Sequence, residues 1–339
     1  MPLPPRWLRR VVFAPLALAV ALVALVTLPV AAIVAALASR FVPGRWRPLR
    51  LLWFAVVYLA VEAIVLLAAF GLWVASGFGW AIRRERFMDA HYRLLAWFLD
   101  RVVSVGQRTF DVRLDIRESG KRQEHAPRLV LSRHAGPGDS FLLVHTVCQR
   151  QRRPRIVLKD TFQWEPMIDT LLGRLPCQFV SPNPRPGAGG ELIEGIEELA
   201  AGMGDRDSLI IFPEGGNITE RRRVRSIAKL EERGRHEDAE RARRMRHVMA
   251  PRPGGALAAL DVCPQAEVVF VAHTGLEDLS SAVDLWRGLP MDSAVHALTW
   301  FVPREEVPAS REEQVDWLFT WWKRIDTWIG DTRAEPWAI

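Results

Sequence analysis

Two short blocks contain the residues best suited to chemistry, and the first is a histidine–aspartate pair. His134 and Asp139 follow the apolar segment 128–131, with a Gly-Pro-Gly sequence between them. Such a sequence favours a turn, which can fold the carboxylate back toward the imidazole. An aspartate that accepts from one ring nitrogen fixes the tautomer and leaves the other nitrogen as a general base. The alternative is a loop histidine followed by an aspartate that caps the helix starting near Ser140.

The second block is Phe212-Pro213-Glu214-Gly215, which follows the apolar segment beginning at Leu209. A carboxylate and a glycine at a strand end offer one acceptor and exposed backbone N–H groups. An ordinary strand-to-helix turn is the alternative interpretation. The sequence lacks a G-x-S-x-G nucleophile motif, metal-ligand spacing and a glycine-rich phosphate fingerprint.

Together the two blocks resemble those of the glycerolipid acyltransferase family, the lysophosphatidic acid acyltransferases and their relatives. That family has an H-x4-D block, matched by His134 and Asp139, and an FPEG block, matched about 80 residues later by 212–215. The resemblance covers roughly residues 125–330. Three further segments are similar to the branch that contains the lysocardiolipin and related lysophospholipid acyltransferases: Lys159–Pro166 with Gly173, Thr219-Glu220 with the charged segment after it, and Pro251–Gly255.

The resemblance implies an O-acyltransferase that moves a fatty acyl group from acyl-CoA or acyl carrier protein to a lysophospholipid hydroxyl. The acceptor it suggests is 1-acylglycerol-3-phosphate or a related lysolipid. It implies that His134 acts as the general base and that Asp139 orients it. No metal or cofactor is expected, and acyl-CoA is a co-substrate. The implied substrate-binding residues are Phe212, Pro213, Glu214, Gly215, Arg252 and Lys159.

This chain departs from the family pattern at three places, one of which is the middle block, where no clear arginine follows the strand that contains Phe179. The family often has Thr-Arg after FPEG, where this chain has Gly216-Asn217, and a proline in its fourth block, where Val271-Ala272-His273 stands. The missing arginine bears on recognition of the acceptor's phosphate, and Arg252, Arg185 or 221–223 could supply its charge. A glycolipid or other non-phosphatidate acceptor is therefore an alternative. A noncatalytic protein that binds anionic lipid, and a lipid hydrolase, are the others.

The elements that must position these residues alternate between strands and helices. This order predicts an α/β layered domain with a mostly parallel central sheet over residues 109–339. Strands are predicted at 110–116, 128–131, 155–158, 177–180, 209–212, 268–272 and 295–302, and helices at 140–151, 163–172, 191–203, 253–260 and 311–329.

The first 82 residues have a different composition. Segments 11–38 and 51–82 are apolar, with Glu62 as their only charge, and each is long enough to span a membrane. We expect a transmembrane helical hairpin, since the apolar core of a signal peptide, the alternative for the first segment, is shorter. An amphipathic helix over 83–108 is expected at the membrane interface or beneath the domain. Six flanking arginines against four in the connector favour a catalytic domain on the cytoplasmic face of the cell membrane.

The net charge of +6 is concentrated in one segment. Residues 221–247 hold 11 Lys/Arg and 5 Asp/Glu, so the rest of the chain sums to zero. The segment is predicted to be helical with a break at Gly234. It is either a solvated helix face or a surface for anionic headgroups or polyphosphate. Nucleic acid is not expected, because no aromatic residues are interleaved with the charges, and three cysteines cannot form a disulfide framework.

Overall fold

The N-terminal region of the computed structural model, which describes residues 3–181, 189–277 and 286–334, is a helical hairpin. A short helix α1 (Arg6–Leu8) and a π-helical turn η1 (Arg9–Phe13) lead into α2 (Ala14–Ala38), and α3 (Arg47–Ala75) returns beside it. The second helix ends seven residues earlier than predicted. Gly77 and Gly79 adopt φ values of 72° and 96°, and this left-handed backbone turns the chain into the next helix.

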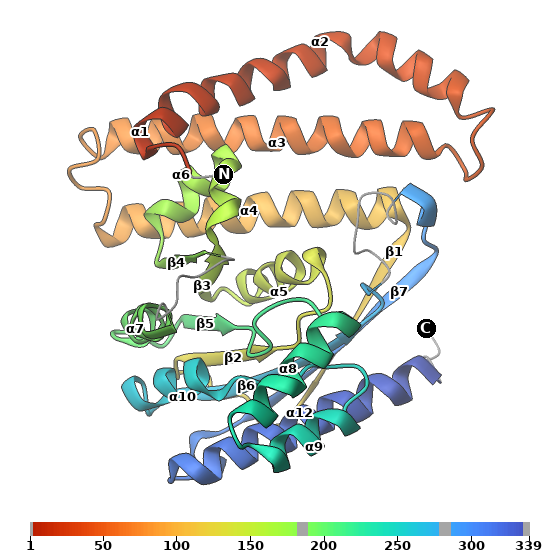
Figure 1. Cartoon of the computed structure of the whole chain (residues 1–339). Coiled ribbons are helices and arrows are strands. Elements are labelled where there is room, and N and C mark those ends of the chain that lie inside the picture. Colours follow the sequence, from red (N-terminus) through yellow and green to blue (C-terminus); the bar gives the residue numbers. More distant parts are fainter. Residues whose placement is uncertain (1–2, 182–188, 278–285, 335–339) are drawn as a thin grey trace.

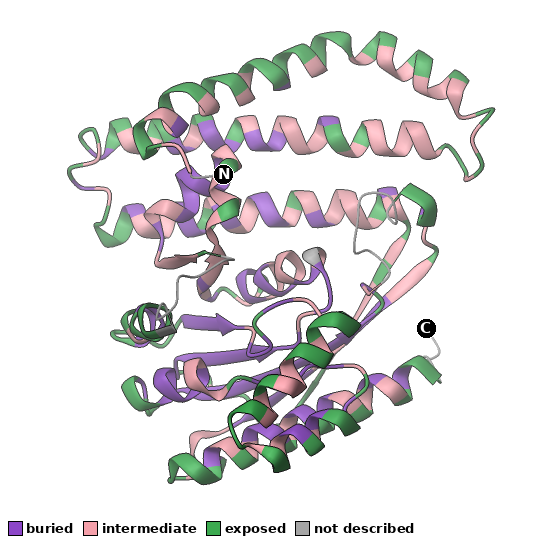
Figure 2. Ribbon diagram, viewed as in Figure 1, coloured by how far each residue is buried: buried purple, intermediate pink, exposed green. Residues whose placement is uncertain are grey.

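Helix α3 lies along the domain rather than pointing away from it (Figure 1). It packs against α4 (Glu85–Phe110), which in turn packs on α5 (Pro137–Gln149), so α4 lies beneath the domain's own layer of helices. Near one end of α3, Arg50 donates to the Thr109 carbonyl at 2.6 Å; near the other, Arg174 donates to the Ala69 carbonyl at 2.7 Å. Helix α2 is outermost, and its apolar side chains are exposed (Figure 2), as at Val26, which is 70% exposed.

Glu62 is the one charged residue in the two apolar segments and is buried where α3 meets α6 (Pro166–Leu171). One helical turn before it, the Tyr58 hydroxyl donates to Glu165 at 3.4 Å, just before α6 begins. The carboxyl of Glu62 therefore faces another part of the protein and not the exposed side of the hairpin.

The domain is built on a seven-stranded sheet with the order β1-β7-β6-β2-β5-β3-β4. Every pair of neighbours is parallel except β6 and β7, so the predicted mostly parallel α/β sheet is confirmed. The strands are β1 (Val112–Ser119), β2 (Arg128–Ser132), β3 (Arg153–Lys159), β4 (Cys177–Val180), β5 (Asp207–Ile211), β6 (Glu267–Thr274) and β7 (Ser293–Val302).

The central strands are buried on both faces, because successive side chains point to opposite sides of the sheet. Leu129 and Leu131 of β2 belong to the core beneath the C-terminal helices, whereas Val130 belongs to the core beneath α4 and α5. The remaining helical elements are η2 (Asp160–Trp164), η3 (Leu172–Arg174), α7 (Gly189–Ala200), α8 (Glu220–Glu232), α9 (His236–Arg244), α10 (Pro253–Val262), η4 (Arg304–Glu306) and α12 (Arg311–Ala334).

The basic segment forms two helices, α8 and α9, that meet at Gly234, whose φ is 71°. Part of its charge is neutralised within the protein: Arg241 pairs with Asp316 at 2.6 Å, and Arg235 pairs with Asp238 at 2.6 Å. Arg223 instead donates to backbone carbonyls near the end of α9. These contacts show that much of the segment's charge holds its own helices in place.

Candidate active site

The two sequence blocks meet at the carboxyl edge of the sheet because of the strand register. β2 and β5 are parallel neighbours, and Leu131 is paired with Ile211. His134 and Glu214 each lie three residues beyond that pair, so both emerge at the same level of the same edge. Ligands of open α/β sheets bind at this edge.

The histidine turn, residues 133–139, places the imidazole on the aspartate. His134 Nδ1 lies 2.9 Å from Asp139 Oδ2. The same oxygen accepts the backbone N–H groups of Ala135 at 2.7 Å and Gly136 at 3.0 Å. An ionised carboxylate only accepts, so Nδ1 carries the proton and Nε2 keeps its lone pair. The side chain of His134 is 13% exposed, which leaves a basic nitrogen within reach of a substrate.

Asp139 is nearly completely buried, yet its pKa lies below the ordinary value. Burial by itself raises the pKa, but the hydrogen bond and charge of His134, the nearby His273 and the N–H of Gly136 together outweigh it. The carboxylate is therefore ionised at neutral pH. Its charge can stabilise an imidazolium when His134 takes a proton.

The glutamate turn, residues 212–217, holds a carboxyl group that is even more deeply buried, with Glu214 1% exposed. Its two oxygens accept from the backbone N–H of His134 at 3.3 Å and of Met249 at 3.1 Å. Burial raises the pKa of Glu214 to about 8, despite the opposing charge of Arg133 and these two N–H groups. Glu214 thus ties together three segments, the histidine turn, its own turn and the loop before α10.

The two turns are in direct contact with each other. The ring of Phe212 lies against the imidazole of His134, with centroids 4.5 Å apart and planes inclined by 31°. The backbone N–H of Ile218 donates to the His134 carbonyl at 3.1 Å. His134 is therefore fixed by its own turn and by the neighbouring one.

Two arginines lie over the glycines of the glutamate turn, and the charge of a third, Arg233, acts on one of them. Gly215 and Gly216 have φ values of 70° and 152°, and a Cβ on Gly215 would stand 2.7 Å from a guanidinium nitrogen of Arg252. A Cβ on Gly216 would lie 2.6 Å from Arg222 in the same way. Partial burial lowers the pKa of Arg252, as do the charges of Arg233 and Arg222. Within the described residues no carboxylate pairs with Arg222, Arg233 or Arg252, which we name the arginine cluster. Such a cluster attracts an anion.

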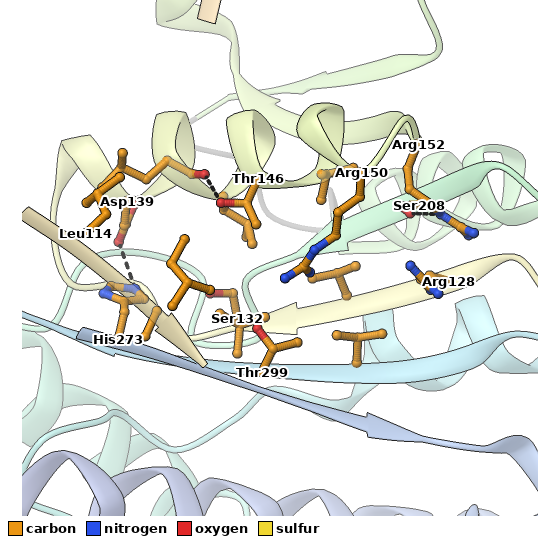
Figure 3. Close-up of a pocket in the computed structure, with 18 of the residues that line it drawn as sticks. Leu114, Arg128, Ser132, Asp139, Thr146, Arg150, Arg152, Ser208, His273 and Thr299 are labelled. Carbon is orange, nitrogen blue, oxygen red and sulfur yellow. Dashed lines mark hydrogen bonds and ion pairs between the residues drawn. The ribbon is translucent and has the colours of Figure 1, made fainter. Parts of the chain in front are cut away.

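A narrow cavity extends to the histidine turn on the side of Asp139. It lies between α5 and the sheet face formed by β1, β7, β6 and β2, and part of it is open to solvent. Its walls are mainly aliphatic. Figure 3 shows Asp139 and His273 at one end and Arg128, Arg150 and Arg152 at the other. The cavity thus runs along β2 toward the carboxylate that contacts the His134 imidazole.

Residues 113–270 match the family model described as Acyltransferase. The match covers just under half of the chain, and over these residues the sequence is similar to that family. It is also similar to the crystal structure of the 1-acyl-sn-glycerophosphate (LPA) acyltransferase, PlsC, from Thermotoga maritima, at 15% identity and a TM-score of 0.49, covering 86% of this chain and 100% of that one. No curated protein sequence matches the chain.

The domain brings together most of the substrate-binding residues predicted from sequence. Phe212, Glu214 and Gly215 adjoin His134, and the Pro213 carbonyl accepts from the N–H of Arg252 at 2.9 Å. Lys159 ends β3, three residues after Ile156, which is paired with Ile210. It therefore lies on the same edge, one strand away, and its role in binding stays a prediction. Arg185 lies outside the described residues.

Two residues of the site were not predicted, Arg133 and His273. Arg133 is 1% exposed and donates to the His273 carbonyl at 2.6 Å, to Glu277 at 2.5 Å and to the His247 carbonyl at 3.1 Å. His273 Nε2 lies 3.8 Å from Asp139 Oδ2. The signal for His273 was present, because it follows a predicted strand in place of the family's proline. Nothing in the sequence marks Arg133 as an inward-pointing arginine.

Proposed function

We propose that this acyltransferase transfers a fatty acyl group from a thioester donor to the hydroxyl of a lysophospholipid, with His134 as the general base. The observation that carries the proposal is the 2.9 Å contact between His134 Nδ1 and Asp139, which leaves the Nε2 lone pair available as a base. A general base held in this way accelerates a reaction by about 10²–10⁴-fold.

The reaction then needs no acyl-enzyme. His134 Nε2 removes the proton of the acceptor hydroxyl as its oxygen attacks the thioester carbonyl carbon. The new ester C–O bond forms, the C–S bond breaks, and the imidazolium returns its proton to the departing thiolate. Asp139 stabilises the positive imidazolium between these two events. Holding the donor and the acceptor together in one site contributes as much as the proton transfer, or more.

We assign the acyl chain of the donor to the cavity beneath α5. A mainly aliphatic wall suits a hydrocarbon chain, and one end of the cavity is lined by Asp139, the carboxylate that contacts the proposed base. The carrier of the acyl group, coenzyme A or acyl carrier protein, stays outside this cavity. In this proposal the carrier is a co-substrate, and the reaction requires no resident cofactor.

The arginine cluster is our proposed site for the acceptor's anionic headgroup. The chain lacks the arginine that the family often places after FPEG, and Arg222 and Arg252 instead approach the same turn from α8 and from the loop before α10. Guanidinium groups bind phosphate through paired hydrogen bonds. This supports 1-acylglycerol-3-phosphate or a related anionic lysolipid over an uncharged acceptor.

The hairpin explains how an insoluble acceptor reaches the site. Both helices are long and apolar enough to cross a membrane, but α3 is tied to the domain near both of its ends. A helix of 29 residues is about 44 Å long. Because contacts near both ends hold α3 along the surface of the domain, α3 cannot extend away from the domain into a bilayer while these contacts persist. We propose that the hairpin enters the membrane sideways with α2 facing the lipid. The cytoplasmic location and the division into hairpin, linking helix and domain stay predictions.

Acyl transfer by the purified full-length protein tests the proposal. Labelled acyl-CoA, and in parallel acyl carrier protein thioester, is incubated with lysophosphatidate in mixed micelles, and the lipid product is identified by mass spectrometry. We expect transfer by the natural chain and its loss in His134→Ala. His145→Ala is the matched control, since His145 lies on the same helix as Asp139 but contacts Asp100 and Gln149 instead.

The same assay separates the alternatives. Transfer retained by folded His134→Ala would remove the imidazole from the mechanism. Free fatty acid formed without an acceptor would indicate a hydrolase. Binding of anionic vesicles without any turnover, lost on charge reversal in α8, would indicate a noncatalytic lipid-binding protein. Transfer to glycolipids but not to lysophospholipids would change the acceptor class.

A further inference from the structure

Three polar side chains interrupt the aliphatic wall of the cavity near its catalytic end. They are Ser132 on β2, His273 on β6 and Thr299 on β7, all lining the cavity and all labelled in Figure 3. Val271 is paired with Ser132 on one side and with Thr299 on the other, and His273 is two residues further along β6. Residues so placed share one face of the sheet. We call these three side chains the polar cluster.

The cluster is deeply buried and has hydrogen-bonding capacity to spare. Its members are 1%, 6% and 3% exposed, in the order Ser132, His273 and Thr299. His273 Nε2 lies 3.1 Å from the Arg133 carbonyl, which can only accept, so Nε2 carries the proton and Nδ1 is an acceptor. Among the described residues Nδ1 has no partner. Ser132 donates to the same carbonyl at 3.1 Å and keeps its acceptor lone pairs, and the Thr299 hydroxyl bonds to no other described residue.

A saturated chain would leave these groups unpaired. Buried polar groups without partners weaken binding, and a site built to hydrogen-bond a hydroxyl rejects the analogue that lacks it. The cluster offers an acceptor at His273 Nδ1 and a free donor at Thr299, on diagonal positions of neighbouring strands. The Cα atoms of diagonal neighbours lie about 7–8 Å apart, and their side chains project from the same face, so that one substrate hydroxyl placed between the two polar groups can contact both.

We propose that the cavity selects acyl chains that carry a hydroxyl group in the part of the chain next to the thioester. The location of the cluster places the hydroxyl there, because His273 is 3.8 Å from the carboxylate that holds the catalytic imidazole. The proposal rests on the proposed acyl transfer and names its donor class. The hydroxyl donates to His273 Nδ1 and accepts from Thr299, and the chain beyond it lies between α5 and β7.

The far end of the cavity does not offer the same chemistry. Arg128 is paired there with Glu267 at 2.7 Å, Arg150 with Glu118, and Arg152 with the Ala126 and Asp207 carbonyls. These guanidinium groups already have acceptors. A hydroxyl at the far end of a chain would therefore find fewer free partners than one near the thioester.

A competition between matched donors tests the proposal. A saturated acyl thioester, its 3-hydroxy analogue and its ω-hydroxy analogue, all of equal chain length, are mixed in one reaction with the full-length protein. Product ratios by mass spectrometry give relative kcat/KM. We expect the 3-hydroxy chain to be preferred by about ten- to hundredfold, the effect of one or two unpaired buried groups.

Variants of Thr299 assign that preference to the cluster. Thr299→Val removes the donor at constant shape and should lower the ratio by about tenfold, whereas Thr299→Ser keeps the hydroxyl and the preference. Thr274→Val is the matched control, because Thr274 is buried on the same strand as His273 but faces the other side of the sheet.

Each other outcome has a separate meaning. Equal use of saturated and 3-hydroxy chains overturns the donor assignment and leaves acyl transfer intact; water then occupies the cluster. Preference for the ω-hydroxy chain also overturns it. Retention of the preference in folded Thr299→Val removes the cluster as its cause. Failure to transfer any chain, from either carrier, refutes the proposed function itself.

Discussion

The histidine turn and the glutamate turn each bury a carboxyl group at the same edge of the sheet, and the two groups differ in charge. Asp139 and Glu214 are 3% and 1% exposed. The pKa of Asp139 is nevertheless lowered, whereas that of Glu214 is raised to about 8. Burial acts in the same direction on both. The difference lies in their partners.

Asp139 has the stronger set of donors. It accepts from an imidazole, two backbone N–H groups and the Ser140 hydroxyl, whereas Glu214 accepts from two backbone N–H groups at 3.1 and 3.3 Å. Donors stabilise the ionised form, so their number and kind decide which carboxyl stays charged. We infer a division of roles in which Asp139 supplies charge to the imidazole of His134, the proposed base, and Glu214 joins segments of the chain.

Asp139→Asn should produce the largest effect, because it removes the charge and reverses the hydrogen bond. An amide that donates to Nδ1 forces the proton onto Nε2, which then cannot act as a base. We expect kcat to fall by about 10²–10⁴-fold. Steady-state transfer at saturating lysolipid measures it. Asp100→Asn, on α4 and bonded to Gln149, is the control. An unchanged kcat would mean that the charge of Asp139 is not used.

Glu214→Gln should affect stability more than chemistry. The folded-state pKa of about 8 exceeds the ordinary value of 4.5. Above pH 4.5 the unfolded chain has lost this proton and the folded chain still holds it, so stability falls as pH rises to about 8. At pH 7 this costs about 3 kcal/mol.

Glutamine does not titrate, so the variant should lose this slope of stability against pH. Urea unfolding of the two proteins in parallel between about pH 5 and about pH 8, a range that lies within this window, measures the difference. If natural and variant proteins show the same slope, Glu214 is ionised in the folded state and the contrast with Asp139 disappears.

Arg252→Gln should weaken binding of the acceptor and leave the general base unchanged. Losing one guanidinium of the arginine cluster should raise KM for an anionic lysophospholipid by about tenfold, the value of a charge-assisted hydrogen bond. KM for an uncharged monoacylglycerol should change less. Arg225→Gln, at an exposed position of α8, is the control. Equal effects of Arg252→Gln on both acceptors would place the headgroup elsewhere.

The sequence predicted the strands that position the two turns, but it did not predict which side chains come together between those strands. The strand predicted at 177–180 has its observed bounds, and the break of the basic helices falls on Gly234 as expected. Apolar periodicity and glycine are local signals, so such features are readable in advance. Strand register and side-chain packing link residues that are far apart in sequence. They determine that the Arg133 side chain is buried, and they align Ser132, Val271 and Thr299. The contact of α3 with α4 is of the same kind.

Phe212→Leu should have the smallest effect, and it tests whether the two turns work as one unit. Leucine keeps apolar bulk but loses the ring face that lies 4.5 Å from the imidazole. Contacts of this kind contribute about 0.5–1.5 kcal/mol, so we expect kcat to fall about two- to tenfold. The decisive measurement is the same substitution made in Asp139→Asn.

If Phe212 acts by orienting the base, Phe212→Leu should have little effect in Asp139→Asn, where the tautomer is already wrong. The decreases in kcat caused by the two substitutions will then not be additive. Full additivity would mean that Phe212 contacts the substrate instead. In that case the glutamate turn contributes directly to binding, and the division between a charged turn and a joining turn has to be redrawn.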